Sequence, residues 1–157
     1  MPVVPISSTL GGDDMHDQAV TLFNRHNGKW YPTVIHGVTV VELTVTSTTE
    51  TAGRTNGDTV ELSIKTTVAK AIETTVGLKP YIPPKAYAVC TDPGKCVTFK
   101  PEQDFVYIGE WPVVEPIPDD DFESGFYHAI NEEHDGVYMI TSVSWLGLIP
   151  HFEIGGR

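Results

Sequence analysis

The stretch TVELSIKT, residues 59–66, decides the fold class because its side chains alternate between apolar and polar. The apolar set is Val60, Leu62 and Ile64, and the polar set is Glu61, Ser63 and Lys65. A period of two is typical of a strand with one face toward a core and one face toward solvent. The stretch therefore predicts a β-sheet that covers a core on one side.

Toward the N-terminus, two further strands are predicted around a tight turn. AVTLFN, residues 19–24, is followed by RHNGKW, where an Asn-Gly pair stands at the place a two-residue hairpin turn requires. The next strand, residues 30–46, is rich in β-branched and aromatic residues. Its alternation is strongest at Val41, Leu43 and Val45. Pro32 and Gly37 interrupt it, so we expect an edge position or a β-bulge there.

The middle of the chain gives weaker patterns. TTVAKAIETTVG, residues 66–77, favours a short helix that ends at Gly77, with a strand as the alternative. The proline-rich residues 78–89 predict an extended segment. Two strands joined by a polar turn are expected at residues 97–99 and 105–109.

The last third of the chain predicts one helix and one hairpin. In residues 121–133, Phe122, Phe126 and Ile130 are spaced i, i+4, i+8 after an Asp-rich start, which is typical of an amphipathic helix. The final residues, 137–157, read as a hairpin in which Ile140 breaks the alternation. The helix should pack on the sheet.

These patterns predict a mainly β protein, a small antiparallel β-barrel or sandwich with one short amphipathic helix and a long exposed loop. The loop is residues 47–59, which are polar and lie between two predicted strands. A length of 157 residues, 40% of them hydrophobic, fits one domain. We place this domain at residues 19–157 and expect residues 1–18 to form a flexible N-terminal arm.

The net charge of −11, from 21 acidic and 10 basic residues, argues against binding nucleic acid through a basic face. No run approaches the roughly 20 apolar residues of a membrane-spanning helix. The first residues also lack the basic and apolar regions of a signal peptide. We therefore expect synthesis in the cytoplasm and no association with a membrane.

Residues capable of catalysis or metal binding are present, but their spacing matches no known site. His128 and His134, with two glutamates between them, form the best metal cluster, and solvated side chains near a helix end explain it more simply. The sequence has no phosphate-binding glycine motif and no GxSxG serine motif. For Cys90 and Cys96, which flank TDPG, we expect free thiols or a labile bridge. We predict no catalytic residue, no metal and no cofactor.

The aromatic residues leave a second class of function open. Trp30, Tyr31, Trp111 and Trp145 could line a binding face of a carbohydrate-binding or adhesion β-sandwich. Most aromatic residues of a small β protein fill its core, which makes this the weaker alternative.

The order of short motifs resembles that of the head-tail joining or head-completion (stopper) proteins of tailed bacteriophages and prophages. The motifs are VTLFNR, WYPTVIHGV, TVELSI, YIPPKAY and DFVYIGE, then an acidic helix and the terminal YMITSVSW and PHFEIGGR. The terminal pair carries most weight, because that family has a late strand like YxITSV, a turn and a last strand of the HFEI type. The N-terminal arm and residues 67–95 depart from the family pattern, so adaptor, stopper and tail-terminator positions all stay open.

The resemblance implies a barrel that assembles as a six-fold homo-oligomeric ring in the neck of the virion, after synthesis in the host cytoplasm. Its partners would be the portal or adaptor protein and the tail-terminator or tail-tube proteins, and packaged DNA would pass through without sequence-specific binding. A loop between early strands would gate the channel, and the arm would bind neighbours. The gating candidates are Thr48, Thr49, Glu50, Thr51, Gly53, Arg54, Thr55, Asn56 and Gly57. The arm candidates are Val3, Val4, Ile6 and Leu10.

Overall fold

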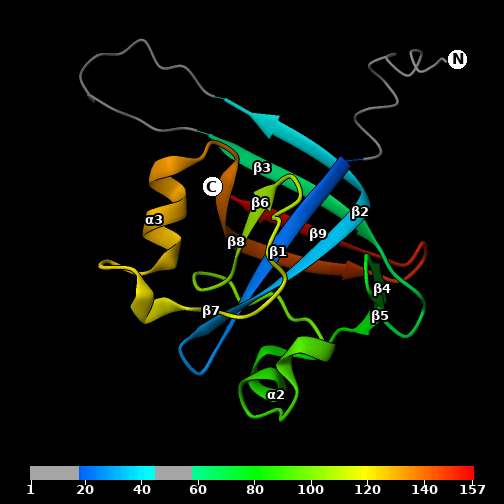
Figure 1. The fold of residues 1–157 in the computed structure, drawn as a ribbon. Coiled ribbons are helices and arrows are strands. Elements are labelled where there is room, and N and C mark those ends of the chain that lie inside the picture. Colours follow the sequence, from blue (N-terminus) through cyan, green and yellow to red (C-terminus); the bar gives the residue numbers. More distant parts are fainter. Residues whose placement is uncertain (1–17, 45–57) are drawn as a thin grey trace, which may run out of the picture.

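A closed, six-stranded antiparallel β-barrel forms the body of the protein in a computed structural model that describes residues 18–44 and 58–157 (Figure 1). Its strands are β1 (Gln18–His26), β2 (Lys29–Leu43), β3 (Thr59–Lys65), β6 (Phe105–Ile108), β8 (Val137–Leu146) and β9 (His151–Gly156). They are ordered β1-β6-β8-β9-β3-β2, and pairing of β1 with β2 closes the barrel. The predicted fold class is confirmed, with the barrel in place of the sandwich.

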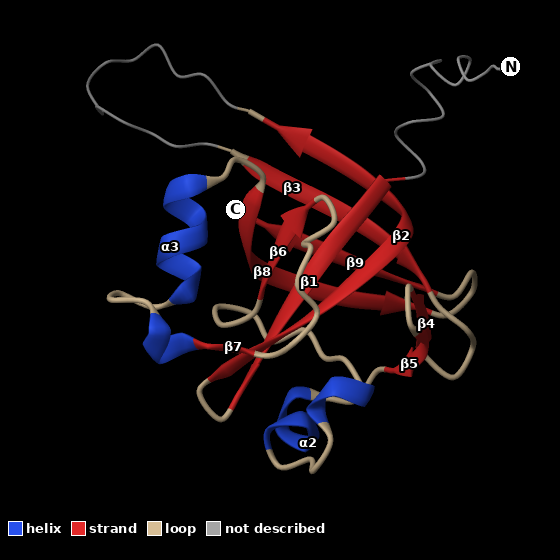
Figure 2. Cartoon of the chain, viewed as in Figure 1, coloured by secondary structure: helices blue, strands red, loops and turns tan. Residues whose placement is uncertain are grey.

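The remaining elements are short and lie outside this ring of strands (Figure 2). They are β4 (Ala71–Thr74), β5 (Gly77–Pro80), β7 (Ile117–Pro118), α2 (Pro84–Ala88), α3 (Phe126–Glu133) and the 3-10 turns η3 (Pro93–Lys95) and η4 (Asp119–Asp121). β7 extends the sheet beside β2, and β4 and β5 pair with each other. Of the α-helices in the described part of the chain, α3 alone is longer than five residues.

The helix predicted at residues 66–77 is wrong, and the strand alternative is right. Ile72 and Thr74 point inward from β4 while Glu73 points outward, which is the alternation of a strand. Lys70 and Gly77 both have positive φ, 68° and 106°, and so turn the chain before and after the strand. The predicted extended segment is also wrong in part, since α2 begins at Pro84, where a proline fits the first turn of a helix.

The first hairpin and the bend of β2 follow the prediction. Asn27 and Gly28 have φ of 50° and 77°, as a two-residue turn between β1 and β2 requires. The register of β1 against β2 shifts next to Gly37, whose φ is 73°. This β-bulge marks the place where β2 leaves β1 and begins to pair with β3, so it forms a corner of the barrel.

The barrel interior is mainly aliphatic, with Phe99, Tyr138 and Phe152 among its buried side chains, and β3 contributes the three side chains expected from TVELSIK. Val60, Leu62 and Ile64 are buried. In β2 the strongest alternation of the sequence lies on the outer face, because Val41 and Leu43 are exposed. Val38 and Val40 point into the barrel instead. Val45 lies outside the described residues.

A second cluster, mostly aromatic, lies on the outer side of β1, β6 and β8 beneath α3. Its buried members are Phe23, Trp30, Phe105, Phe126, Ile130 and Val137. The predicted helix exists but begins at Phe126, because Gly125 has a φ of 91° and the Asp119 carboxylate accepts the Phe126 N–H at 2.9 Å. α3 therefore covers one outer wall of the barrel, and Figure 1 shows it beside β6 and β8.

The C-terminal hairpin is confirmed, and the break at Ile140 is a β-bulge between Ile140 and Ser142. The strand predicted at residues 97–99 is wrong, since Val97 makes only an isolated bridge with Tyr81. Val97 and Phe99 are nevertheless buried in the barrel core. The apolar side chains of this segment are therefore explained by burial in the core, although the segment does not pair as a strand of the sheet.

Candidate functional site

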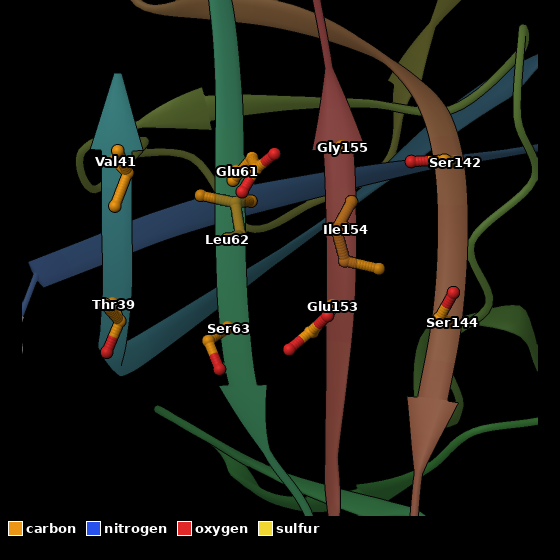
Figure 3. Close-up of a pocket in the computed structure, with 10 residues that line it drawn as sticks. All are labelled: Thr39, Val41, Glu61, Leu62, Ser63, Ser142, Ser144, Glu153, Ile154 and Gly155. Atoms are coloured by element: carbon orange, nitrogen blue, oxygen red, sulfur yellow. The ribbon is translucent and has the colours of Figure 1, made fainter. Parts of the chain in front are cut away.

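A hollow of about 260 Å³ lies on the outer wall that α3 does not cover (Figure 3). It crosses β2, β3, β9 and β8, and we call it the outer-wall groove. Its lining is Thr39, Val41, Glu61, Leu62, Ser63, Ser142, Ser144, Glu153, Ile154 and Gly155. Leu62 and Ile154 form its floor, because both side chains belong to the barrel core.

Small side chains make the groove possible. A Cβ at Gly155 would lie 2.5 Å from Ser142 Oγ, so this position cannot carry a side chain without movement of its neighbour. The register sets Glu153 between Ser63 on β3 and Ser144 on β8, so hydroxyls flank a carboxylate across three strands. The result is a shallow face of hydroxyl groups with Val41 at one side.

Two carboxylates, Glu61 and Glu153, give the groove its charge. Glu153 Oε2 lies 3.1 Å from His151 Nε2, and His151 Nδ1 lies 2.6 Å from the Ile149 carbonyl oxygen. The Ile149 carbonyl and, after it, Glu153 raise the pKa of His151. His151 is therefore a partner of Glu153 at the end of the groove, and Glu61 has no such neighbour among the ion pairs of the described residues.

The groove has hydroxyl groups but lacks the arrangement that activates one. A serine nucleophile is most often activated by a histidine whose free nitrogen faces the hydroxyl. Both ring nitrogens of His151 already have oxygen partners. No group of three or more His, Cys, Asp or Glu residues suited to a metal ion occurs within residues 18–44 and 58–157. The chemistry that the groove does offer is hydrogen bonding and attraction of positive charge.

Two reactive side chains elsewhere, Cys96 and Lys79, are buried or hydrogen-bonded within the fold. Cys90 and Cys96 are free thiols, and burial raises the pKa of Cys96 to about 11, so it is protonated at neutral pH. Burial likewise lowers the pKa of Lys79, whose Nζ donates a hydrogen bond to Thr33 Oγ1 at 2.9 Å. Neither the Cys96 thiol nor the Lys79 amine is presented as a nucleophile.

The two histidines of the candidate metal cluster have separate partners. His128 Nε2 lies 3.1 Å from Glu132 on the same helix. The His134 ring packs edge-on against Tyr107 and Trp111 at centroid distances of 5.6 and 5.3 Å. His128 thus pairs along the outside of α3, whereas His134 extends the aromatic cluster.

A second hollow lies between the β1–β2 turn and α2, and it is basic where the groove is acidic. Arg25, His26 and Lys100 line it together with Gln103. Arg25 forms an ion pair with Asp119 at 3.4 Å, and His26 Nε2 lies 3.2 Å from the Cys90 carbonyl oxygen. Two of its three basic groups are therefore already engaged within the chain.

The gating residues (48–51, 53–57) and arm residues (3, 4, 6, 10) predicted from the sequence lie outside the described part of the chain. The structure does bring the two ends of the β2–β3 connection together, because Leu43 is paired with Thr59. The sequence did not predict the outer-wall groove. Its only local sign is that the outward-facing residues of TVELSIK and HFEIGG that line the groove are small or acidic. The strand register is needed to show that these residues lie side by side.

Comparison with known proteins identifies a family without assigning an activity. No curated protein and no solved structure matches the chain. Among the described residues, none of the helices has the length and apolar character needed to cross a membrane. Residues 15–157 match the model of a family of unknown function, DUF6751, and the chain belongs to that family.

Proposed function

We propose that this protein is a structural component of the neck of a tailed-phage particle. It forms a ring, six-fold by resemblance, between the portal or adaptor protein and the tail, closes the DNA channel and presents the surface to which the tail attaches. The observation that carries the proposal is a closed barrel completed by its last two strands, β8 and β9. This is the architecture that the motif resemblance implies for such a protein.

The connection between β2 and β3 supports the same proposal. Leu43 and Thr59 are paired, so the polar residues 47–59 join two neighbouring strands at one end of the barrel. A connection of this length costs little stability, because closure entropy grows only slowly with loop length. In the proposed ring this connection faces the channel, and Arg54 is the one basic side chain in it.

Charge is consistent with a channel through which DNA slides. A net charge of −11 produces a field that repels phosphate, which favours passage of DNA over tight binding. Ring subunits also need two different surfaces, one for each neighbour, and a barrel with unlike outer walls provides them.

The aromatic residues give little support to the alternative, a carbohydrate-binding module. Trp30 is buried beneath α3, and Trp111 packs against Phe23 and Phe126. The exposed large hydrophobic residues in the described part of the chain are all aliphatic. A sugar-stacking platform needs an aromatic face open to solvent, and those faces are used here for packing.

The proposal is tested by deleting the gene from the genome that carries it and examining released particles by electron microscopy. We expect DNA-filled heads without tails, or heads that have lost DNA, with recovery when the gene is supplied in trans. A second arm supplies a protein in which residues 49–56 are replaced by a short Gly-containing turn. That protein should fold but should not restore retention of DNA. Normal tailed particles in the deletion strain would show that the protein has no role in the neck.

A further inference from the structure

Exposed aliphatic side chains gather at one end of the barrel. Val68, Leu146, Leu148 and Ile149 are exposed to 78%, 41%, 97% and 73%, and we call these four residues the apolar tip. Three of them lie at or beside the β8–β9 turn, and Val68 lies in the turn between β3 and β4. Figure 1 shows these two turns on the same side of the molecule, away from α3.

Direct contacts hold the two turns of the apolar tip together. The Thr66 N–H donates to the Pro150 carbonyl at 3.2 Å, and Trp145 Nε1 donates to Thr66 Oγ1 at 3.2 Å. The Lys70 ammonium lies 4.7 Å from the centre of the Trp145 ring. These contacts fix the two turns relative to each other, so the apolar tip is an ordered surface whose aliphatic side chains are exposed to solvent.

The apolar tip is the part of this acidic chain best suited to approach another copy of it. No acidic residue occurs between Asp135 and Glu153, although the chain carries 21 of them. Lys65 and Lys70 flank the tip on the neighbouring turn. Two copies with a net charge of −11 repel each other at most relative orientations, and a neutral to basic tip avoids that repulsion.

The outer-wall groove has the complementary properties. Its volume of about 260 Å³ can hold one or two aliphatic side chains, and Val41, Leu62 and Ile154 give it an apolar side and floor. Glu61 and Glu153 place negative charge beside it, opposite in sign to the lysines next to the tip. Figure 3 shows the groove across the middle of the wall that β8 and β9 help to form.

We infer that the apolar tip of one copy docks into the outer-wall groove of a second copy, and that this contact joins neighbouring subunits. The inference rests on the proposed ring and names the surfaces that build it. Tip and groove occupy different places on each copy, so one docking event leaves a free groove on one molecule and a free tip on the other. Such a head-to-tail contact is the kind that closes into rings.

The docking contact is tested by photo-crosslinking the full chain with a benzophenone amino acid at Leu148. An equal mixture of isotope-labelled and unlabelled protein separates adducts between copies from adducts within one copy. We expect mixed-label adducts to peptides that contain residues 39–41, 61–63 or 153–155. The same probe at Val89, which is 80% exposed on another part of the surface, is the matched control and should give no such adducts.

Sedimentation measures what the contact contributes. The double variant L148S/I149S should associate at least about tenfold more weakly than the wild type, because both side chains would leave the groove. Glu61→Lys should also weaken association, and Val89→Ser should leave it unchanged. All four substituted residues are at exposed positions, so folding is expected to be preserved.

Three outcomes would overturn the docking inference. They are association that is unaffected in L148S/I149S, the absence of mixed-label adducts from position 148 at concentrations where the protein self-associates, and wild-type protein that stays monomeric. Mixed-label adducts that join position 148 only to residues 1–17 would show instead that the arm contacts the tip. Failure of the neck proposal is seen separately in the gene deletion, since tip–groove association can be measured whatever particle the protein belongs to.

Discussion

The barrel has two outer walls that differ in what covers them. On the wall made by β1, β6 and the first half of β8, outward side chains such as Phe23 and Phe105 are large and lie beneath α3. On the wall made by β2, β3 and β9, outward side chains such as Glu61 and Ser63 are small or charged, and the surface is a groove. The same barrel thus carries a second core on one side and an open face on the other.

β8 belongs to both walls, and its bulge divides them. Before the bulge, Tyr138 and Ile140 point into the barrel, so Val137 faces the aromatic cluster. After the bulge, Val143 packs against the barrel core, while Ser144 is exposed and lines the groove. One extra residue in a strand reverses which face each later side chain takes. A covered wall and a bare wall can therefore share a strand.

The largest predicted effect tests the covered wall through Phe105→Ala. The Phe105 ring is fully buried and packs against Phe23, Trp30 and Phe126 at centroid distances of 4.7, 4.9 and 6.0 Å. Truncation of a buried phenylalanine costs about 3–5 kcal/mol. We expect a loss of that size in the free energy of unfolding measured with urea. Leu148→Ala, at the exposed end of the bare wall, is the control and should change it by less than about 0.5 kcal/mol.

A smaller effect is expected at Asp119, which fastens α3 to the covered wall. Its carboxylate accepts hydrogen bonds from Trp30 Nε1 at 2.8 Å and from the Phe126 N–H at 2.9 Å. Asp119→Ala should lower the free energy of unfolding by roughly 2 kcal/mol at pH 7, which is typical of hydrogen bonds to a charged group. Asp120→Ala, at an exposed neighbouring position, should have little effect.

The Asp119 contribution should also depend on pH. The hydrogen bond from Trp30 is the main cause that holds its pKa below the ordinary value. A carboxyl group with a lowered pKa stabilises the fold above its unfolded pKa of about 3.9, and this contribution is lost as the pH falls through the folded value. The difference between wild type and Asp119→Ala should therefore be constant from pH 5 to 7 and shrink below about pH 4. A difference that stays constant to pH 2 would mean that the ionised form has no special role.

The features that the sequence predicted are those encoded within one strand or one turn. TVELSIK, the Asn-Gly turn and the terminal hairpin each carry their pattern locally. The difference between the two outer walls is not encoded locally, because it depends on which distant segment packs on the outward side chains of each wall. Asp104 illustrates this. Its buried carboxylate accepts hydrogen bonds from Asn24 Nδ2 and the Arg25 N–H, residues about 80 positions away, and no local pattern predicts that.

The groove could not be predicted for the same reason. The outward residues of β3 and β9 are visible as alternating positions, but only the register shows that Ser63 and Ser144 flank Glu153. The phase of β2 adds a second difficulty. Val38, Val40, Val41 and Leu43 are all apolar, so the sequence does not distinguish the inward set from the outward set. The bulge at Gly37 determines which set is buried.

Two neighbouring valines of β2 test directly which face of that strand is buried. Val40 is 4% exposed and points into the barrel, whereas Val41 is 38% exposed and lines the groove. Threonine has nearly the shape and strand preference of valine, so each substitution mainly exchanges a methyl group for a hydroxyl. Val40→Thr buries that hydroxyl and should cost about 1–3 kcal/mol in the free energy of unfolding. Val41→Thr leaves it at the surface and should change that free energy by no more than about 0.5 kcal/mol. Urea unfolding of both variants measures the difference. Equal losses would mean that both valines are packed, so that the wall of the outer-wall groove is covered in solution. A dilution series of Val41→Thr would then show whether a second copy covers it.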